Sequence, residues 1–518
     1  MKKKISRRKF LAILGVTSGV LVAGGAGGVA YVRSQFIPDT TPGPGTNGEV
    51  VTVAEGQLQG TINDGVYRYL GVPYAEAVER FVPAESVTPW EGIRKADSYG
   101  SMSPQGSMLG FGAGSQDGTD NNCQNLNIWT PGLNDDGLRP VLVWLHGGGF
   151  STGTANDSSY DGEALAKNGD VVVVGINHRL NVFGYLDLSA YDEKYKDSAN
   201  VGMWDIIAAL EWIQQNIEVF GGDPDNVTVF GQSGGGAKVL GLMSTPYAAG
   251  LFHKGIVESG VTETVGVNFT SQEASTRLAE NLLAELNIAP ENIEQIQTIA
   301  VDKLQSVASK ALDKTAQEFQ IPAPLTDGYQ MEWEPVVDGD FLPTSPVTET
   351  GFADAGQDIP LLIGSNLNEW TGMFRTSTDG VDADALSTAL KAAYPDKTDL
   401  TADHVDTLIR LPILKTMSHK ADQNVAPVYA YLLTYGSSNH GAELPYIFRH
   451  SDVSAMNDLF SSIWVNFARN GVPSADGLPT WEAYTREGGA TMLLDTTSTL
   501  VYHHDDALLK LLVPDYEY

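Results

Sequence analysis

The chain has 518 residues, of which 42% are hydrophobic and 9% aromatic, so it is long and apolar enough to bury a large core. Acidic residues outnumber basic ones by 64 to 32, and the formal net charge of -32 repels nucleic-acid phosphates and anionic membrane surfaces. We therefore expect no nucleic-acid partner. The acidic surplus predicts a solvated surface that resists aggregation; the alternative is life in salty water, where counterions screen the repulsion.

The N-terminus carries an export pattern. The stretch "SRRKFL" at residues 6–11, followed by an apolar run, resembles the twin-arginine signal of bacteria. We predict a signal peptide over residues 1–32, cleaved near Ala30, and a flexible leader over residues 33–49. An uncleaved inner-membrane anchor is the alternative, but many glycines lower the hydrophobicity of the run. The predicted location is periplasmic or extracellular, without stable membrane embedding after signal removal.

Strand-like runs alternate with helical ones from residue 50 to 518, and no break in composition divides this region. Apolar runs without polar alternation predict strands buried on both faces, as in a parallel sheet covered by helices. We predict strands at 141–145, 171–176, 227–230, 255–258, 360–363 and 428–434, and a helix over 200–217. Polar, amphipathic helical sequence within 262–355 predicts a cap. The predicted fold class is α/β, a single domain with a large, mostly parallel sheet, flanking helices and helical cap insertions.

Two Gly-x-Ser-x-Gly matches occur, "GFSTG" at 149–153 and "GQSGG" at 231–235. Only the second follows a strand-like run, "VTVF", and precedes a possible helix, "GAKVLGLM". A nucleophile elbow requires that setting, because a strained turn lifts the serine hydroxyl above the sheet. Ser233 is therefore the candidate nucleophile, and Gly234 supplies an unobstructed N–H group.

The first match belongs to "LHGGGF" at 145–150, which follows the predicted strand 141–145. Glycine-rich backbone at the carboxyl end of a strand can present N–H groups to an oxyanion. A plain glycine loop is the alternative. The two glycine motifs occur in the chain order that a hydrolase needs, which favours the oxyanion reading.

A serine nucleophile also needs a base and an acid, and in this order of elements the acid precedes the histidine. Seven histidines follow Ser233. His440 lies in "GSSNHGAELP", directly after the predicted strand 428–434, and Glu369 lies just past the predicted strand 360–363. Asp338 and Asp340 are competing acids, but no long strand precedes them.

These residues together resemble the type-B carboxylesterases, a family of α/β-hydrolases. The resemblance runs from about Val50 to the C-terminus and is carried by the motifs "GVPYA", "CQNLNIWTP", "WLHGGGFSTG", "NHRLNVFGYL", "FGGDPDNVTVFGQSGGG", "GLFHKGIVESG", "GSNLNEW", "HGAELPYIF" and "WVNFARNGVPS". It implies that Ser233 is the nucleophile, His440 the general base and Glu369 the acid.

The resemblance further implies an oxyanion hole built from the N–H groups of Gly148, Gly149 and Gly234. Carboxylic esters of small molecules would be hydrolysed through an acyl-enzyme, with neither a metal nor an organic cofactor. Lipase, thioesterase and amidase activities remain alternatives, as does a non-catalytic binding protein of the same fold. Acyl and alcohol preference and the oligomeric state are left open.

Five features depart from the family pattern. Gln232 is neutral where the common elbow has glutamate, and Trp370 replaces a glycine after the acid. Some relatives form a disulfide that ends at the position of Cys123, the single cysteine of this chain. Ser103 occupies the position of the first cysteine of that disulfide. Asn121 and Asn122 replace an acidic pair, and the loop before them has no tryptophan to contact a quaternary ammonium group. We therefore expect choline esters to be poor substrates.

Overall fold

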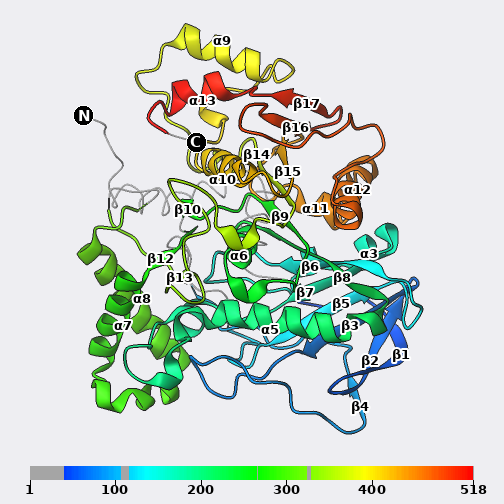
Figure 1. The fold of residues 1–518 in the computed structure, drawn as a ribbon, viewed down its shortest axis with the longest axis vertical. Coiled ribbons are helices and arrows are strands. Elements are labelled where there is room, and N and C mark those ends of the chain that lie inside the picture. Colours follow the sequence, from blue (N-terminus) through cyan, green and yellow to red (C-terminus); the bar gives the residue numbers. More distant parts are fainter. Residues whose placement is uncertain (1–39, 107–115, 265–266, 324–327, 517–518) are drawn as a thin grey trace, which may run out of the picture.

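The computed structural model describes residues 40–106, 116–264, 267–323 and 328–516 (Figure 1). The predicted signal peptide (1–32) lies outside these residues. The first strand begins at Thr46, so residues 46–49 belong to the sheet and not, as expected, to the leader. Thr46 lies opposite Ile62 on the neighbouring strand. Backbone pairing with that strand holds residues 46–49 in the sheet, although their composition favours a turn.

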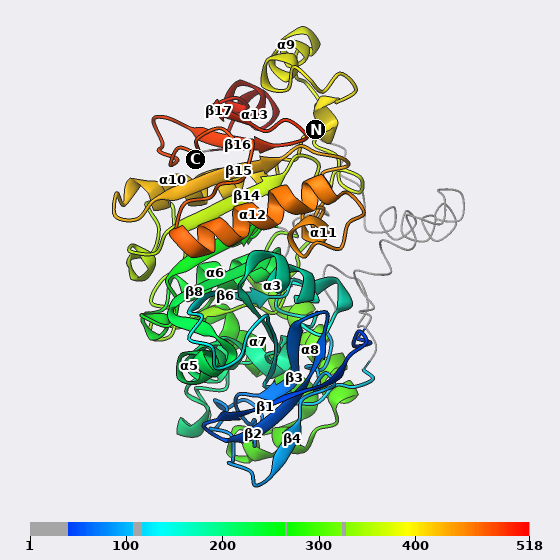
Figure 2. The same ribbon diagram turned by 90° about the vertical axis from the view of Figure 1, so that its right-hand side faces the viewer.

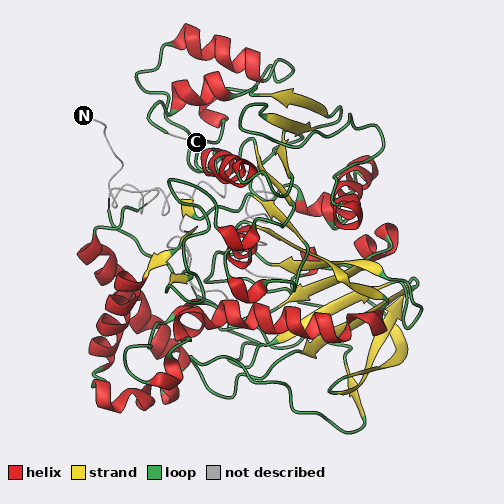
Figure 3. Cartoon of the chain, viewed as in Figure 1, coloured by secondary structure: helices red, strands yellow, loops and turns green. Residues whose placement is uncertain are grey.

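A 13-stranded mixed sheet forms the centre of the described part of the chain (Figures 1 and 3). Its strands are β1 (Thr46–Val53), β2 (Gly56–Asn63), β3 (Val66–Pro73), β4 (Ile93–Lys95), β5 (Asn125–Thr130), β6 (Arg139–Leu145), β7 (Val172–Ile176), β8 (Gly222–Gln232), β9 (Lys254–Glu258), β14 (Leu361–Asn366), β15 (Val428–Leu433), β16 (Ala490–Leu494) and β17 (Thr499–Tyr502). Two short pairs lie outside it: β10 (Glu263–Thr264) with β11 (Val267–Asn268), and β12 (Thr270–Ser271) with β13 (Val336–Val337).

The strands lie in the order β1-β2-β3-β5-β7-β6-β8-β9-β14-β15-β16-β17, with β4 beside β2. Figure 2 shows this series running from β1 at one end of the molecule to β17 at the other. The strands from β7 to β16 are parallel, whereas β1, β2, β3 and β5 form an antiparallel end and β17 an antiparallel edge. All six predicted strands are confirmed, and β8 is longer than predicted.

Burial on both faces explains the unbroken apolar sequence of the parallel strands. In β6, Val141 and Val143 belong to one hydrophobic cluster, while Leu142 and Trp144 belong to another on the opposite face. Alternate side chains of a strand point to opposite faces, so both faces need apolar residues.

Helices cover both faces of the sheet (Figures 1 and 2). They are α3 (Glu163–Gly169), α4 (Asn181–Tyr185), α5 (Val201–Asn216), α6 (Gly234–Leu242), α7 (Gln272–Leu286), α8 (Val301–Phe319), α9 (Ala383–Ala393), α10 (Arg410–Asp422), α11 (Leu444–Ile447), α12 (Ser454–Asn470) and α13 (Asp506–Leu512). Helices α5, α6 and α10 pack on the face of Val141, and α3 and α12 on the face of Trp144. None of the described helices is both long and apolar enough to cross a bilayer.

The segment 262–355, predicted as a cap, contains α7 and α8, which pack on one another. Ser271 begins α7 by accepting a hydrogen bond from the N–H group of Ala274 at 3.3 Å. The Phe269 ring, just before α7, contacts Phe150 edge-on with ring centroids 6.1 Å apart. This contact joins the helical segment to the glycine loop after β6.

Candidate active site

Ser233 occupies a sharp turn between β8 and α6. Its φ of 58° and ψ of -124° are a conformation that only a strained turn imposes on a residue with a side chain. The turn is held on both sides, because the Ser233 N–H group donates to the Glu258 carbonyl at 2.8 Å and the Ser233 carbonyl accepts from Ala237 at 3.1 Å. Ser151, the serine of the other match, lies in an ordinary loop turn where its N–H group donates to Gly148.

The glycines around the serine give room for this turn. A Cβ atom on Gly231 would lie 2.5 Å from the carbonyl carbon of Gly235, and one on Gly236 would lie 2.8 Å from the Cα of Gly260. Both distances are too short for real side chains. The glycine-rich sequence therefore permits strand, turn and helix backbones to approach closely.

His440 and Glu369 lie side by side at the carboxyl ends of β15 and β14. The His440 Nδ1 atom is 2.5 Å from the Glu369 Oε2 atom, and both residues are buried. The other carboxylate oxygen, Oε1, accepts hydrogen bonds from the Ser259 hydroxyl at 2.6 Å and the Asn366 N–H group at 2.7 Å. The carboxylate is thus fixed at both oxygens and orients the imidazole.

The opposite nitrogen of His440 faces the elbow. Its Nε2 atom lies 3.1 Å from the side-chain nitrogen of Gln232, the residue before Ser233. Because an amide nitrogen can only donate, this contact requires an unprotonated Nε2 and places the ring hydrogen on Nδ1, beside Glu369. The Trp370 ring stacks on the imidazole with centroids 4.4 Å apart and an interplanar angle of 30°.

The two competing acids are engaged elsewhere. A side-chain oxygen of Asp338 accepts a hydrogen bond from Asn200 at 2.8 Å, and Asp340 accepts one from the Tyr247 hydroxyl at 3.1 Å. Of the three acids considered from the sequence, the structure brings Glu369 to His440.

The backbone of the loop after β6 directs N–H groups towards one side. The Gly148 carbonyl accepts from Thr152 N at 3.0 Å, and the Gly147 carbonyl is 2.8 Å from the His146 Nδ1 atom. Carbonyl and N–H groups of a trans peptide point in opposite directions. The N–H groups of Gly149 and Gly148 therefore point away from these partners, in a turn that needs the positive φ values of both glycines, 60° and 89°.

This loop contacts the elbow directly. A Cβ on Gly234 would lie 2.5 Å from the Gly149 nitrogen, and one on Gly147 would lie 3.6 Å from the Ser233 Cβ. Among the described residues, the N–H groups of Gly148, Gly149 and Gly234 find no hydrogen-bond acceptor. Three donors next to the serine are therefore available to a ligand.

Three further buried carboxyl groups lie behind His440, and the sequence reading missed them. Burial raises the pKa of Glu443 to about 7, and the charge of Glu369 adds to the rise. The same two causes raise the pKa of Asp406 to about 7. Burial, and then Glu443, raise the pKa of Glu258 well above its ordinary value. Glu443 follows His440 by three residues, and Glu258 directly precedes Ser259. Their closeness in the sequence to residues of the site is the signal that could have identified them as functional candidates.

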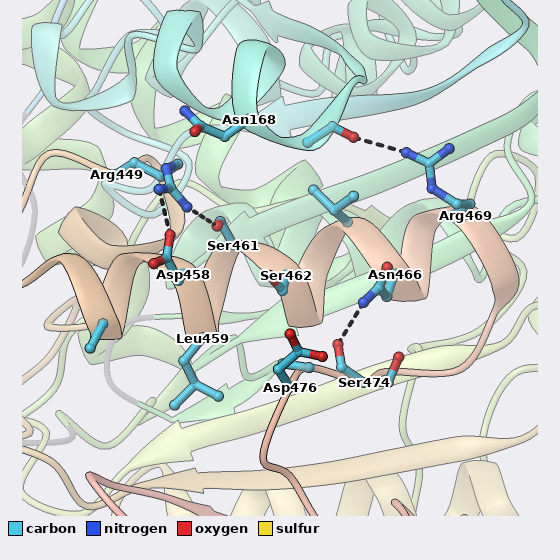
Figure 4. A pocket seen from close by; sticks show the side chains of 14 residues that line it. Asn168, Arg449, Asp458, Leu459, Ser461, Ser462, Asn466, Arg469, Ser474 and Asp476 are labelled. Atoms are coloured by element: carbon cyan, nitrogen blue, oxygen red, sulfur yellow. Dashed lines mark hydrogen bonds and ion pairs between the residues drawn. The ribbon is translucent and has the colours of Figure 1, made fainter.

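A cavity of about 720 Å³ lies away from this site, between α3 and α12 (Figure 4). Its polar side chains are largely engaged with one another: Arg449 pairs with Asp458 at 2.6 Å, and Arg469 donates to the Gly169 carbonyl at 2.8 Å. None of the candidate site residues lines it.

A mostly parallel central sheet, a strained serine after β8, and a histidine–carboxylate pair after β15 and β14 define an α/β-hydrolase. Comparison with known proteins identifies the family within this fold class. The model of the carboxylesterase family matches residues 47–399 and 391–508, so the chain belongs to this family.

Individual relatives agree. The chain is 34% identical over 490 residues to the para-nitrobenzyl esterase of Bacillus subtilis, covering 87% of this chain and 96% of the relative. It is 30% identical over 511 residues to the human cocaine esterase, covering 84% and 86%. A solved esterase from Clostridium hathewayi that can hydrolyse aliphatic aromatic polyesters superposes with a TM-score of 0.79 and 33% identity, covering 90% and 98%. The chain is a carboxylic ester hydrolase of the serine type.

Proposed function

We propose that Ser233, His440 and Glu369 form the catalytic triad of this esterase. The observation that carries the proposal is the position of His440, whose Nδ1 atom lies 2.5 Å from Glu369 while its Nε2 atom faces the elbow at Gln232. An imidazole held in this tautomer can accept a proton at Nε2 and, once charged, is stabilised by the carboxylate.

The reaction is a double displacement. The Ser233 Oγ atom attacks the ester carbonyl carbon while His440 takes the hydroxyl proton, and the carbonyl oxygen becomes an oxyanion. When this intermediate collapses, His440 returns the proton to the departing alkoxide, leaving an acyl-serine and an alcohol. Water then attacks the acyl-serine with the same base, and the carboxylic acid and the free serine are released.

The N–H groups of Gly148, Gly149 and Gly234 serve the oxyanion in both steps. Donors that are fixed before the reaction need no reorganisation when negative charge develops, and losing one such donor in a comparable protease costs about 2.7–4 kcal/mol of transition-state stabilisation. The Gln232 side-chain nitrogen lies 3.1 Å from the His440 Nε2 atom, the nitrogen that is proposed to accept the serine proton.

The proposed substrates are uncharged esters of small molecules with apolar groups. Trp370, stacked on His440, supplies an aromatic surface next to the base, and the neutral Gln232 removes a charge that would attract cations. The name of the para-nitrobenzyl esterase relative is in keeping with an aromatic ester. Choline esters are expected to react poorly.

Turnover of p-nitrophenyl esters of increasing acyl length, by the wild type and two serine variants, tests the proposal. Ser233→Ala is expected to lower kcat by about 10⁴-fold or more, because no nucleophile replaces the hydroxyl. Ser151→Ala, in the other glycine motif, is the matched control and should keep kcat within about twofold. Equal activity of wild type and Ser233→Ala would overturn the triad; a preference for long acyl chains with a rise above the solubility limit would indicate a lipase.

We also propose that the chain is exported by the twin-arginine route, on the strength of "SRRKFL" at residues 6–11. Replacing Arg7 and Arg8 with lysine should retain the protein in the cytoplasm of a bacterium that uses this route, while Lys3→Arg should not. Unchanged export of the double variant would contradict the proposal.

A further inference from the structure

A buried lysine lies behind the glycine loop. Lys238 is on α6, one turn beyond Ser233, and its side chain is 0% exposed. Its Nζ atom donates to the carbonyl oxygens of His146 at 2.8 Å and Gly149 at 3.0 Å. The two carbonyls stand at the two ends of the loop 147–149, so one ammonium group holds both ends.

Among the described residues, no carboxylate pairs with this ammonium group. Lys238 forms no ion pair with any described residue, and its Nζ atom lies 5.4 Å from the centre of the Phe150 ring. The titratable neighbours are two histidines on adjoining loops, His146 and His178, whose rings stack 5.0 Å apart. Burial and the charge of Lys238 lower the pKa of both histidines, so they stay neutral.

A structural role alone gives a poor account of this lysine. Burying an ammonium group without a counter-ion is unfavourable, and a neutral donor could satisfy the same two carbonyls. An unpaired positive charge next to the loop becomes favourable when negative charge appears on the other side of that loop. The oxyanion of ester hydrolysis is such a charge.

Resting on the function proposed above, we propose that Lys238 is the positioning residue of the oxyanion hole. Its ammonium group holds the peptide units 146–147 and 149–150, one at each end of the loop. Gly148 and Gly149 are thereby fixed between two held ends with their N–H groups towards Ser233, and the unpaired positive charge of Lys238 stabilises the oxyanion through the loop. No bond to substrate is involved; Lys238 acts through the backbone donors and through its charge.

Burial lowers the pKa of Lys238 to about 7. The ammonium form, which carries the charge, is therefore present below about pH 7 in the free protein and is lost as the pH rises. Any catalytic advantage of the charge must shrink over the same range, whereas a purely steric role would not depend on pH.

The test compares Lys238→Met, Lys238→Arg and a matched control, Lys420→Met. Lys420 is also buried, donates to a carbonyl, that of Gln357, at 2.8 Å and lies near a phenylalanine ring, but it is on α10, outside the candidate site. Steady-state kinetics with p-nitrophenyl acetate would be measured from about pH 6 to about pH 9, beside wild type and Ser233→Ala.

Lys238→Met is expected to lower kcat about 10- to 100-fold at pH 6 with KM changed less than about twofold, since the oxyanion exists only after binding. The ratio of wild-type to Lys238→Met kcat should fall as the pH rises. Lys238→Arg should recover most of the loss and remove the pH dependence of its ratio to Lys238→Met, because arginine stays charged. Lys420→Met should match wild type at every pH.

Folded Lys238→Met with wild-type kcat, a ratio independent of pH, or an equal loss in Lys420→Met would overturn the proposal. So would failure of both Lys238 variants to fold while Lys420→Met folds, because the lysine would then serve the fold. Equal activity of wild type and Ser233→Ala would instead reject the triad, which separates the two proposals.

Discussion

The two sides of the candidate site hold buried groups that ionise with opposite signs. Behind His440 lie the carboxyl groups of Glu369, Glu443 and Asp406, whereas behind the glycine loop lies the ammonium group of Lys238. Ester hydrolysis separates charge in the same sense, with an imidazolium on one side and an oxyanion on the other. The comparison teaches that buried groups without direct contact to substrate can match the charge distribution of a transition state in advance.

The largest expected effect lies on the carboxylate side. Glu369→Gln should lower kcat by about 10³- to 10⁴-fold, because an amide cannot stabilise an imidazolium and can hold the wrong tautomer. Kinetics with p-nitrophenyl acetate measure the loss. Asp340→Asn, at a competing acid outside the site, is the control; a loss in this variant and none in Glu369→Gln would reverse the choice of acid.

The next effect lies on the loop side. Gly148→Ala should lower kcat by about 10²-fold, because a Cβ would lie 2.5 Å from the Thr152 carbonyl oxygen and turn the donors away. Gly65→Ala has a similar φ, 82°, with nothing within 4 Å of the new Cβ, and serves as control for backbone strain. Equal kcat in both variants would show that the loop contributes no donors.

Much of this arrangement was predictable from the sequence. Apolar runs located all six predicted strands, and one serine of two stood between a strand and a helix, because these signals are local. The order of the strands in the sheet has no local signal in the sequence. For example, β6 lies between β7 and β8, and only long-range packing decides this order.

The charged groups behind the site were harder to foresee. Glu443 and Glu258 are ordinary glutamates in the sequence. Their pKa values are raised chiefly by burial, and then by the charges of Glu369 and Glu443 respectively, which lie far from them in the sequence. Lys238 did carry a signal, since it is the single charged residue in the apolar, glycine-rich run "GGGAKVLGLM". A charge in such a run predicts either exposure or a function.

A smaller effect concerns stability on the carboxylate side. The pKa of Glu443 is raised from 4.5 to about 7, chiefly by burial. The folded chain thus binds this proton more tightly than the unfolded chain, and stability falls as the pH rises between these two values. Glu443→Gln cannot ionise at this position. The Tm of this variant minus the Tm of the wild type should therefore increase by about 2–5 °C from pH 4.5 to pH 8. A constant difference in Tm, or one that follows the exposed control Glu280→Gln, would contradict this.

The smallest expected effect concerns the Trp370 ring, which stacks on His440. Trp370→Ala should lower kcat about threefold to tenfold, since stacked aromatic pairs contribute about 0.5–1.5 kcal/mol beyond burial. The comparison with Trp90→Ala, a tryptophan on the β2 and β4 side, separates loss of stacking from loss of a ring. Unchanged kcat in Trp370→Ala would show that Glu369 alone orients His440.

The roles of the carboxyl groups behind His440 and of Lys238 behind the glycine loop require that Ser233 form the covalent intermediate. Labelling the wild-type protein with a p-nitrophenyl phosphonate and mapping the modified peptide by mass spectrometry tests this directly. The expected result is one phosphonate per chain on Ser233, with no label in Ser233→Ala. A label on Ser151, or an unlabelled chain that still hydrolyses esters, would contradict it.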